Sequence, residues 1–191
     1  KLAYTIAADG SVRVCETMTA DPSRKDVAEL MRFGMAFEMP GMFDAVEYYG
    51  RGPMENYADR AAAAFVGRYA QRVADQFHMK YASPQESGTR GGLRWWRLTD
   101  ASGFGIEICS DCHFSASALP YSIPQFDNGS SEYVRHPGDL VPDGRTHVNI
   151  ESVQSGLGCV NSWGRMPLPQ YRLTYQDYGF NFILRPINCK E

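Results

Sequence analysis

The chain has 191 residues, 43% of them hydrophobic, and 22 acidic against 19 basic side chains give it a formal net charge of −3. A chain of this length and apolar content can bury a core, and its length suits one domain spanning residues 1–191. It has no basic block and no apolar run near the roughly 20 residues that cross a bilayer. We therefore expect neither a nucleic-acid partner nor a membrane segment.

The first residues run from Lys1 directly into the strand-like LAYTI and carry no signal-peptide pattern. Because the sequence opens without a methionine, we expect it to be part of a longer protein. Its compartment stays open between the cytoplasm and the periplasm.

The five cysteines are an odd number spread through the chain, which favours reduced thiols over a disulfide framework. Cys109 and Cys112 form a CxxC motif within GIEICSDCHFSAS, whose alternation of apolar and polar residues predicts a strand. Residues three apart on a strand point to opposite faces, and no second CxxC or His pair completes a tetrahedral site. We expect no metal site in this chain.

Alternating residues predict strands from the start of the chain. Leu2 to Thr19 is typical of a hairpin around the turn pair Asp9 and Gly10. A strand is expected from Leu30 to Glu38, and another from Asp44 to Tyr49, which Gly50 to Pro53 should end. The segment from Asp59 to Gln76 is ambiguous, because Ala61 to Ala64 favour a helix while Ala64 to Arg72 alternate as a strand does.

The rest of the chain continues the β pattern. The expected strands are Leu93 to Asp100, Gly103 to Cys109, Phe114 to Ala118, Thr146 to Val153, Gln170 to Tyr175 and Phe180 to Leu184. Tyr121 to Arg145 is rich in Pro, Gly, Asn and Asp and is expected to be mostly loop, with one strand around Glu132 to Arg135. Many short, evenly spaced strands predict an all-β antiparallel sandwich.

A glycine-rich loop, QSGLGCVNSWG from Gln154 to Gly164, places Trp163 between two predicted strands. Gly156 and Gly158 allow backbone angles that side chains forbid, while Asn161 and Ser162 can bond to the backbone and fix the loop. A large ring on such a loop either packs on the core or meets a ligand.

Three further segments combine glycine, charge and aromatic residues: Glu47 to Arg60, Ser83 to Arg90 and His136 to Leu140. Arginine and carboxylate groups in such turns either organise the backbone or form a polar cup for a sugar. Organisation of the backbone is the expected role. The residues of this expected network are Arg51, Glu55, Asp59, Arg60, Glu86 and Arg90.

A glycosidase needs two carboxyl groups that face each other across the scissile bond. Sequence spacing cannot show whether any two of the available carboxyls converge. The candidates are Glu55, Asp59, Glu86 and Asp139. The four histidines are isolated from one another and have no Ser or Cys elbow motif beside them, so each is expected to be structural. They are His78, His113, His136 and His147.

An ordered set of motifs resembles a known family. GRGPMENYADR, PQESGTR, FSAS, HPGDL, HVNIE before QSGLG, NSWG and YGFNFILRP occur in this order from about Ala3 to Pro186. The set is similar to the C-terminal small-chain domain, domain 5, of the LacZ-type β-galactosidases of glycoside hydrolase family 2. Each motif alone is weak, but their order is specific.

The resemblance implies a galactose mutarotase-like supersandwich, with some strands of the full domain lying ahead of Lys1 and an exposed sheet edge that invites self-association. It implies a TIM-barrel catalytic domain of the same polypeptide as partner, a galactoside such as lactose as substrate, and a homo-oligomer. The catalytic glutamates and the magnesium and sodium sites of the family lie in the catalytic domain. No catalytic residue and no cofactor are therefore expected in this chain.

The resemblance also assigns residues. Trp163 is expected to be the sugar platform of the aglycone subsite, exposed here because the other half of that site lies on the barrel. Asn161, Ser162, Gly156 and Gly158 match the supporting loop. Cys159 and Val160 depart from the family's glycine and acidic residue, and the spelling after His136 also departs, so His136 receives no role. The family's extended chain favours a strand for Ala64 to Arg72.

Two other functions remain open at this stage: a free-standing carbohydrate-binding module, and an aldose mutarotase or epimerase. The first requires a concave site within this chain, and the second a His and a carboxylate facing a sugar-sized pocket. The second is raised only by analogy of fold.

Overall fold

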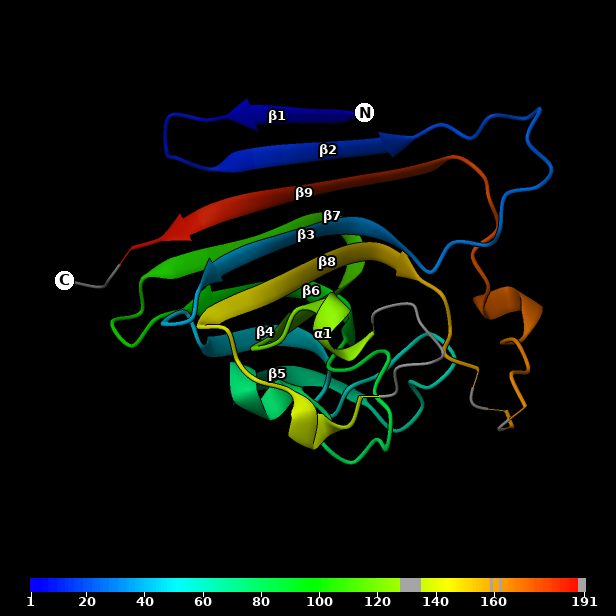
Figure 1. Ribbon diagram of the computed structural model, residues 1–191. Helices are drawn as coiled ribbons and strands as arrows, with labels where there is room; N and C mark the ends of the chain where they lie inside the picture. Colours follow the sequence, from blue (N-terminus) through cyan, green and yellow to red (C-terminus); the bar gives the residue numbers. More distant parts are fainter. Residues whose placement is uncertain (128–134, 159, 162, 189–191) are drawn as a thin grey trace.

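The computed structural model describes residues 1–127, 135–158, 160–161 and 163–188, and in that part of the chain β-strands dominate (Figure 1). The strands are β1 (Leu2–Ile6), β2 (Val12–Met18), β3 (Arg32–Pro40), β4 (Ala45–Gly52), β5 (Phe65–Arg72), β6 (Arg90–Thr99), β7 (Gly105–Leu119), β8 (Arg145–Gln154) and β9 (Tyr178–Ile187). The short helical turns are η1 (Val73–Gln76), α1 (Ile123–Phe126), η2 (Pro137–Asp139) and η3 (Pro169–Tyr171).

The nine strands form one antiparallel sheet that branches at β7. Its main path runs β1-β2-β9-β7-β6-β4-β5. On the edge of β7 away from β6, the residues 105–110 pair with β9 and the residues 115–119 pair with β8, which in turn pairs with β3. The arm formed by β3 and β8 lies across β7, β6 and β4 (Figure 1). The all-β antiparallel class is therefore confirmed.

The main core lies between the β3–β8 arm and the rest of the sheet. Val148 and Ile150 of β8 share one buried cluster with Trp96 of β6 and Phe182 of β9. On β3, Phe33, Met35, Phe37 and Met39 are half-buried while Gly34, Ala36 and Glu38 are exposed. One face of the arm is thus apolar, as the alternation in the sequence requires. A smaller cluster under the β7–β8 connection contains Phe77, Leu119, Phe126 and Leu140.

Most predicted strands are confirmed. β1 and β2 form the hairpin, β3, β8 and β9 follow the alternating runs, and Phe65–Arg72 is a strand and not the alanine helix. Cross-strand pairing explains the last outcome, because Tyr69 packs on Tyr48 of β4 with ring centroids 5.4 Å apart. Tertiary contacts here override the helix propensity of the alanines.

Three predictions about strands are wrong. β4 does not end at Tyr49 but continues through Gly50 to Gly52. A Cβ at Gly50 would lie 2.5 Å from Leu93 Cδ2, so the glycine here allows β6 to pack closely against β4. The two strands predicted between Gly103 and Ala118 are one strand, β7, whose register against β6 shifts where the sequence pattern changes phase. A bulge interrupts the alternation without ending the strand.

The third wrong expectation is a strand from Gln170 to Tyr175. η3 (Pro169–Tyr171) and one isolated bridge from Leu173 to Leu30 occupy this segment. Pro167 and Pro169 lack backbone N–H groups, and proline favours the start of a helical turn over a sheet ladder. The predicted strand at Glu132 to Arg135 lies almost wholly outside the described residues.

A buried charge cluster fastens the β3–β8 arm to the loop before β6. The guanidinium of Arg32, on β3, donates to Glu151 of β8 through Nη1 and to Glu86 through Nη2. The Glu151 side chain is 2% exposed, and its Oε2 has no hydrogen-bond partner among the described residues. Burial raises the pKa of Glu151 to about 7, which Arg32 opposes and the charge of Glu86 reinforces.

We expect the stability of this region to fall as the pH rises from about 5 to 7. In this interval the unfolded chain releases the Glu151 proton while the folded chain keeps it, so the folded state loses up to about 1 kcal/mol per pH unit. Above pH 7 both states are ionised and the effect levels off. Calorimetric unfolding of the full-length polypeptide across this range, compared with Glu151→Gln, measures it. Parallel curves for the two proteins would contradict the assignment.

Candidate functional site

Three connections meet at one end of the sheet and carry most of the polar residues singled out in the sequence. They are the residues 53–64 between β4 and β5, 77–89 between η1 and β6, and 155–177 between β8 and β9. Hydrogen bonds between side chains and backbone, described below, join the first connection to each of the other two.

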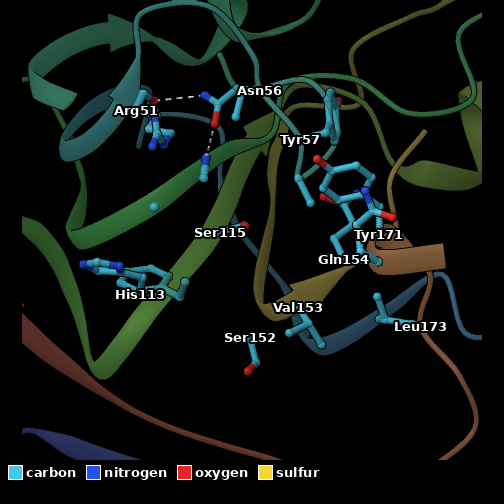
Figure 2. Close-up of a pocket in the computed structure, with 16 residues that line it drawn as sticks. Arg51, Asn56, Tyr57, His113, Ser115, Ser152, Val153, Gln154, Tyr171 and Leu173 are labelled. Carbon is cyan, nitrogen blue, oxygen red and sulfur yellow. Dashed lines mark hydrogen bonds between the residues drawn. The ribbon is translucent and has the colours of Figure 1, made fainter. Parts of the chain in front are cut away.

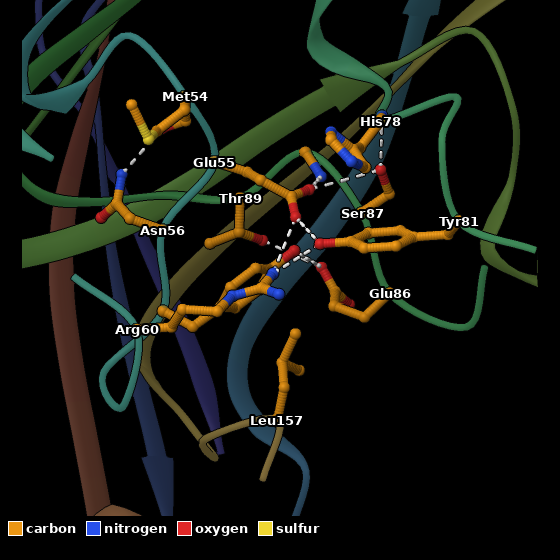
Figure 3. Close-up of polar contacts among 12 residues, drawn as sticks. Met54, Glu55, Asn56, Arg60, His78, Tyr81, Glu86, Ser87, Thr89 and Leu157 are labelled. Carbon is orange, nitrogen blue, oxygen red and sulfur yellow. Dashed lines mark hydrogen bonds and ion pairs between the residues drawn. The ribbon is translucent and has the colours of Figure 1, made fainter. Parts of the chain in front are cut away.

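Glu55 is the centre of the first junction (Figure 3). Its Oε1 accepts from Arg60 Nη2 at 2.8 Å and from the hydroxyl of Tyr81, and its Oε2 accepts from the backbone N–H of Gly88 at 2.8 Å. Arg60 also donates to the Tyr81 hydroxyl at 2.7 Å, and its guanidinium lies 5.0 Å from the ring centroid of Tyr57. One carboxylate thus holds two connections together.

Glu86 belongs to the neighbouring cluster. Its Oε1 accepts from Thr89 Oγ1 at 3.0 Å and from the Tyr57 hydroxyl at 3.4 Å, while its Oε2 accepts from Arg32. Burial, followed by the charges of Glu86 and Glu55, raises the pKa of Tyr57, so this phenol stays protonated and acts as a donor.

The two remaining arginines of the expected network bind backbone carbonyls and not carboxylates. Arg90 is buried and donates to the carbonyls of Gln76, Gly88 and Pro53. Arg51 donates to the carbonyl of Ala64 at 3.0 Å. Both side chains therefore close loops, because they satisfy carbonyls that no strand partner reaches.

Asp59 lies apart from this network and contacts the tryptophan loop. Its Oδ1 accepts from the N–H of Leu157 at 3.1 Å, and its Oδ2 accepts from the N–H of Gly158 at 2.8 Å. A Cβ at Gly156 would lie 2.6 Å from the Asp59 carboxyl carbon, so a side chain at this position would require the carboxylate to move. The sequence placed Asp59 with Arg51 and Glu55, whereas its contacts are to the loop.

The tryptophan loop is closed at its base and carries its ring in solvent. Gly156 N–H donates to the Tyr171 carbonyl at 2.7 Å. Gly158 has φ +77°, a conformation that favours glycine. Asn161 Oδ1 accepts from the backbone N–H of Trp163 at 2.9 Å and from that of Arg165 at 3.4 Å. Trp163 is 91% exposed.

Trp163 is therefore not a core residue, as the resemblance implied. Val160 is 56% exposed, so the departure from the family's acidic residue here adds an apolar group at the surface. Ser162 and Cys159 lie outside the described residues.

A pocket of about 460 Å³ opens beside the base of this loop, between the β6–β7 bulge and the end of β8 (Figure 2). Arg51 and His113 line one side of it, and Tyr57, Gln154 and Tyr171 line the other. Its described lining contains one guanidinium and several neutral polar groups but no Asp or Glu. A site of this composition offers hydrogen-bond donors and aromatic rings, without a carboxyl acid or base.

The four candidate carboxyls are each bound by protein groups in this chain. Glu55, Asp59 and Glu86 are each engaged by the groups described above, and Asp139 accepts from the N–H of His136 at 3.0 Å. None of the four lines the pocket.

The histidines are equally dispersed. The His147 ring lies 3.0 Å from Asp143, His136 binds the carbonyl of Ala82, and the His78 ring is tilted against that of Tyr81 with centroids 4.4 Å apart. Only His113 lines the pocket beside the loop. No two of them share a site.

Neither a metal centre nor a membrane helix is found in the described ranges. Within them no group of three or more His, Cys, Asp or Glu residues is placed to hold a metal ion. In the same residues no helix is long and apolar enough to cross a membrane.

Sequence reasoning missed Arg32, Tyr81 and Glu151. Glu151 lies in the polar phase of the alternation in β8, and it is buried because both faces of this strand are covered. Arg32 and Tyr81 carry no signal in the sequence either, since each meets its partner only through the fold.

Comparison of the sequence with known proteins identifies a family. The chain matches the family model of the beta galactosidase small chain over residues 1–184. The beta-galactosidase of Halalkalibacterium halodurans is 36% identical over 193 residues, covering 98% of this chain and 18% of that protein. The beta-galactosidase of Lactobacillus delbrueckii subsp. bulgaricus is 33% identical over 192 residues, covering 99% and 18%.

The beta-galactosidase of Priestia megaterium is 30% identical over 185 residues, covering 96% of this chain and 17% of that protein. This chain thus spans less than one fifth of the length of these relatives. Because the family model covers nearly all of its 191 residues, the chain belongs to the β-galactosidase small-chain family.

Proposed function

We propose that this chain is the small-chain part of a β-galactosidase and that it supplies an aromatic platform for the aglycone sugar, without carrying out the chemistry. The observation that supports this proposal best is Trp163, which is 91% exposed although its loop is held by several hydrogen bonds. An ordered loop that presents a large ring to solvent is typical of a binding group.

A sugar suits this ring physically. The apolar face of a pyranose packs on an aromatic ring, while its hydroxyl groups need polar neighbours. In this proposal the platform is one half of the subsite, and a catalytic domain of the same polypeptide supplies the other half together with the catalytic carboxyls.

The apolar surface around Trp163 is suited to packing against the catalytic domain. Val160, Met166 and Leu168 are 56%, 47% and 50% exposed, so the loop presents several apolar side chains besides Trp163. Exposed apolar groups gathered on one segment mark interaction sites. We assign them to packing against the catalytic domain.

We expect this chain alone to show no hydrolysis of an aryl β-galactoside, because its carboxyls are engaged in structural contacts and none lines the pocket. A chromogenic assay on purified protein measures this. Reproducible turnover that is lost on changing Glu55, Glu86 or Glu151 to Gln would overturn the proposal.

In the full-length polypeptide, we expect Trp163→Ala to raise the KM for lactose roughly 5- to 150-fold, since stacking of about 1 to 3 kcal/mol is lost. Trp163→Phe should recover part of this loss because it keeps an aromatic face. Steady-state kinetics with lactose decides the point. A KM that is unchanged in Trp163→Ala would remove Trp163 from the subsite.

The pocket beside the loop favours one second candidate, a carbohydrate-binding module that acts without the barrel. Its volume suits a monosaccharide, and its lining offers hydrogen-bond donors next to two tyrosine rings. Calorimetry with galactose and lactose tests it, and no heat at millimolar sugar would reject it. The mutarotase alternative lacks support, because the His113 side of the pocket has no carboxylate facing it among the described lining.

A further inference from the structure

We propose that Asp59 is a positioning residue, which sets the place of Trp163 by holding the backbone of its loop. The inference rests on the proposed function of Trp163 as a sugar platform. The carboxylate of Asp59 receives two successive backbone N–H groups, from Leu157 at 3.1 Å and Gly158 at 2.8 Å. These residues lie at the start of the turn that leads to Trp163.

The contact is specific to a carboxylate. An ionised carboxyl group is acceptor-only and its two oxygens face the two donors separately, whereas an amide presents one acceptor and one donor. Charge-assisted bonds of this kind are stronger than neutral ones. Gly156 completes the fit, because any side chain at this position would collide with the carboxylate.

Asp59 is itself held firmly. It lies in a tight turn closed by the bond from Arg60 N–H to the Tyr57 carbonyl at 2.8 Å. Arg60 is anchored to Glu55, and Glu55 binds the N–H of Gly88. The carboxylate is thus connected to the loop before β6 and through it to the sheet.

Past Gly158, local contacts support the loop. Gly158 and Arg165 lie close together, since a Cβ at Gly158 would lie 3.0 Å from the Arg165 carbonyl. Asn161 then fixes the backbone at Trp163. Asp59 bonds the base of the loop to a segment that is distant in the sequence, since Gly158 lies 99 residues from it. Without this bond, we expect Gly158 to lose its position relative to β4.

The test compares Asp59→Ala and Asp59→Asn in the full-length polypeptide with Asp100→Ala as control. Asp100 also accepts two backbone N–H groups, from Ser102 at 2.8 Å and Phe104 at 3.1 Å, but in the β6–β7 turn. We expect Asp59→Ala to raise the KM for lactose roughly threefold to tenfold with a smaller change in kcat, because ordering the loop then opposes binding. Asp59→Asn should be intermediate and Asp100→Ala unchanged.

A double-mutant cycle separates positioning from general destabilisation. In the Trp163→Ala background, we expect Asp59→Ala to change the KM less than about twofold, because the group that it positions is already gone. An equal rise in both backgrounds would overturn the proposal. So would an unchanged KM in Asp59→Ala beside a raised KM in Trp163→Ala.

A spectroscopic experiment distinguishes the proposed role of Trp163 as a sugar platform from the proposed positioning role of Asp59. With 5-fluorotryptophan incorporated, the resonance missing in Trp163→Phe identifies this ring. We expect it to shift in Asp59→Ala and in Gly156→Ala but not in Asp100→Ala, and an unmoved resonance would overturn the role of Asp59. If Trp163→Ala leaves the KM unchanged while this resonance shifts, the sugar platform fails and the positioning of the loop stands.

Discussion

The arrangement depends on one strand that serves two partners on the same edge. β7 is fifteen residues long, and its first part pairs with β9 while its last part pairs with β8. A strand edge can bond only one neighbour at each position, so β9 and β8 must diverge from it. Because of this divergence the β3–β8 arm lies over the rest of the sheet. The core therefore lies between an apolar face of the arm and an apolar face of the sheet.

The same divergence creates the site. The chain leaves β8 and returns at β9, so the 155–177 connection spans the opening of the branch, where it meets the ends of β3 and β4. Backbone there lacks sheet partners and must be satisfied by side chains. Arg90, Glu55 and Asp59 perform this role for carbonyl or N–H groups. A polar cluster at this end of the sheet therefore follows from the topology, before any ligand is considered.

The sequence predicted most strands because burial on one face leaves a local trace, the alternation of apolar and polar residues. It did not predict contacts between distant segments. Arg32 meets Glu151 across 119 residues, and Asp59 meets Gly158 across 99. Periodicity contains no information on such pairs. The motif set identified the loop and its tryptophan, yet it grouped Asp59 with its neighbours in the chain when its partners lie elsewhere.

The stability of the folded state does not by itself explain why the loop around Trp163 is held by so many contacts. A tryptophan that is 91% exposed buries little apolar area, so fixing its loop costs conformational entropy without a matching gain from burial. The fold nevertheless supplies a carboxylate, a glycine with no room for a side chain and an Asx turn to this short segment. Ordering a group before it binds reduces the entropy lost on binding. In the proposed function, this order prepares Trp163 for contact with a sugar, and the Asp59 carboxylate holds the base of its loop through Leu157 and Gly158.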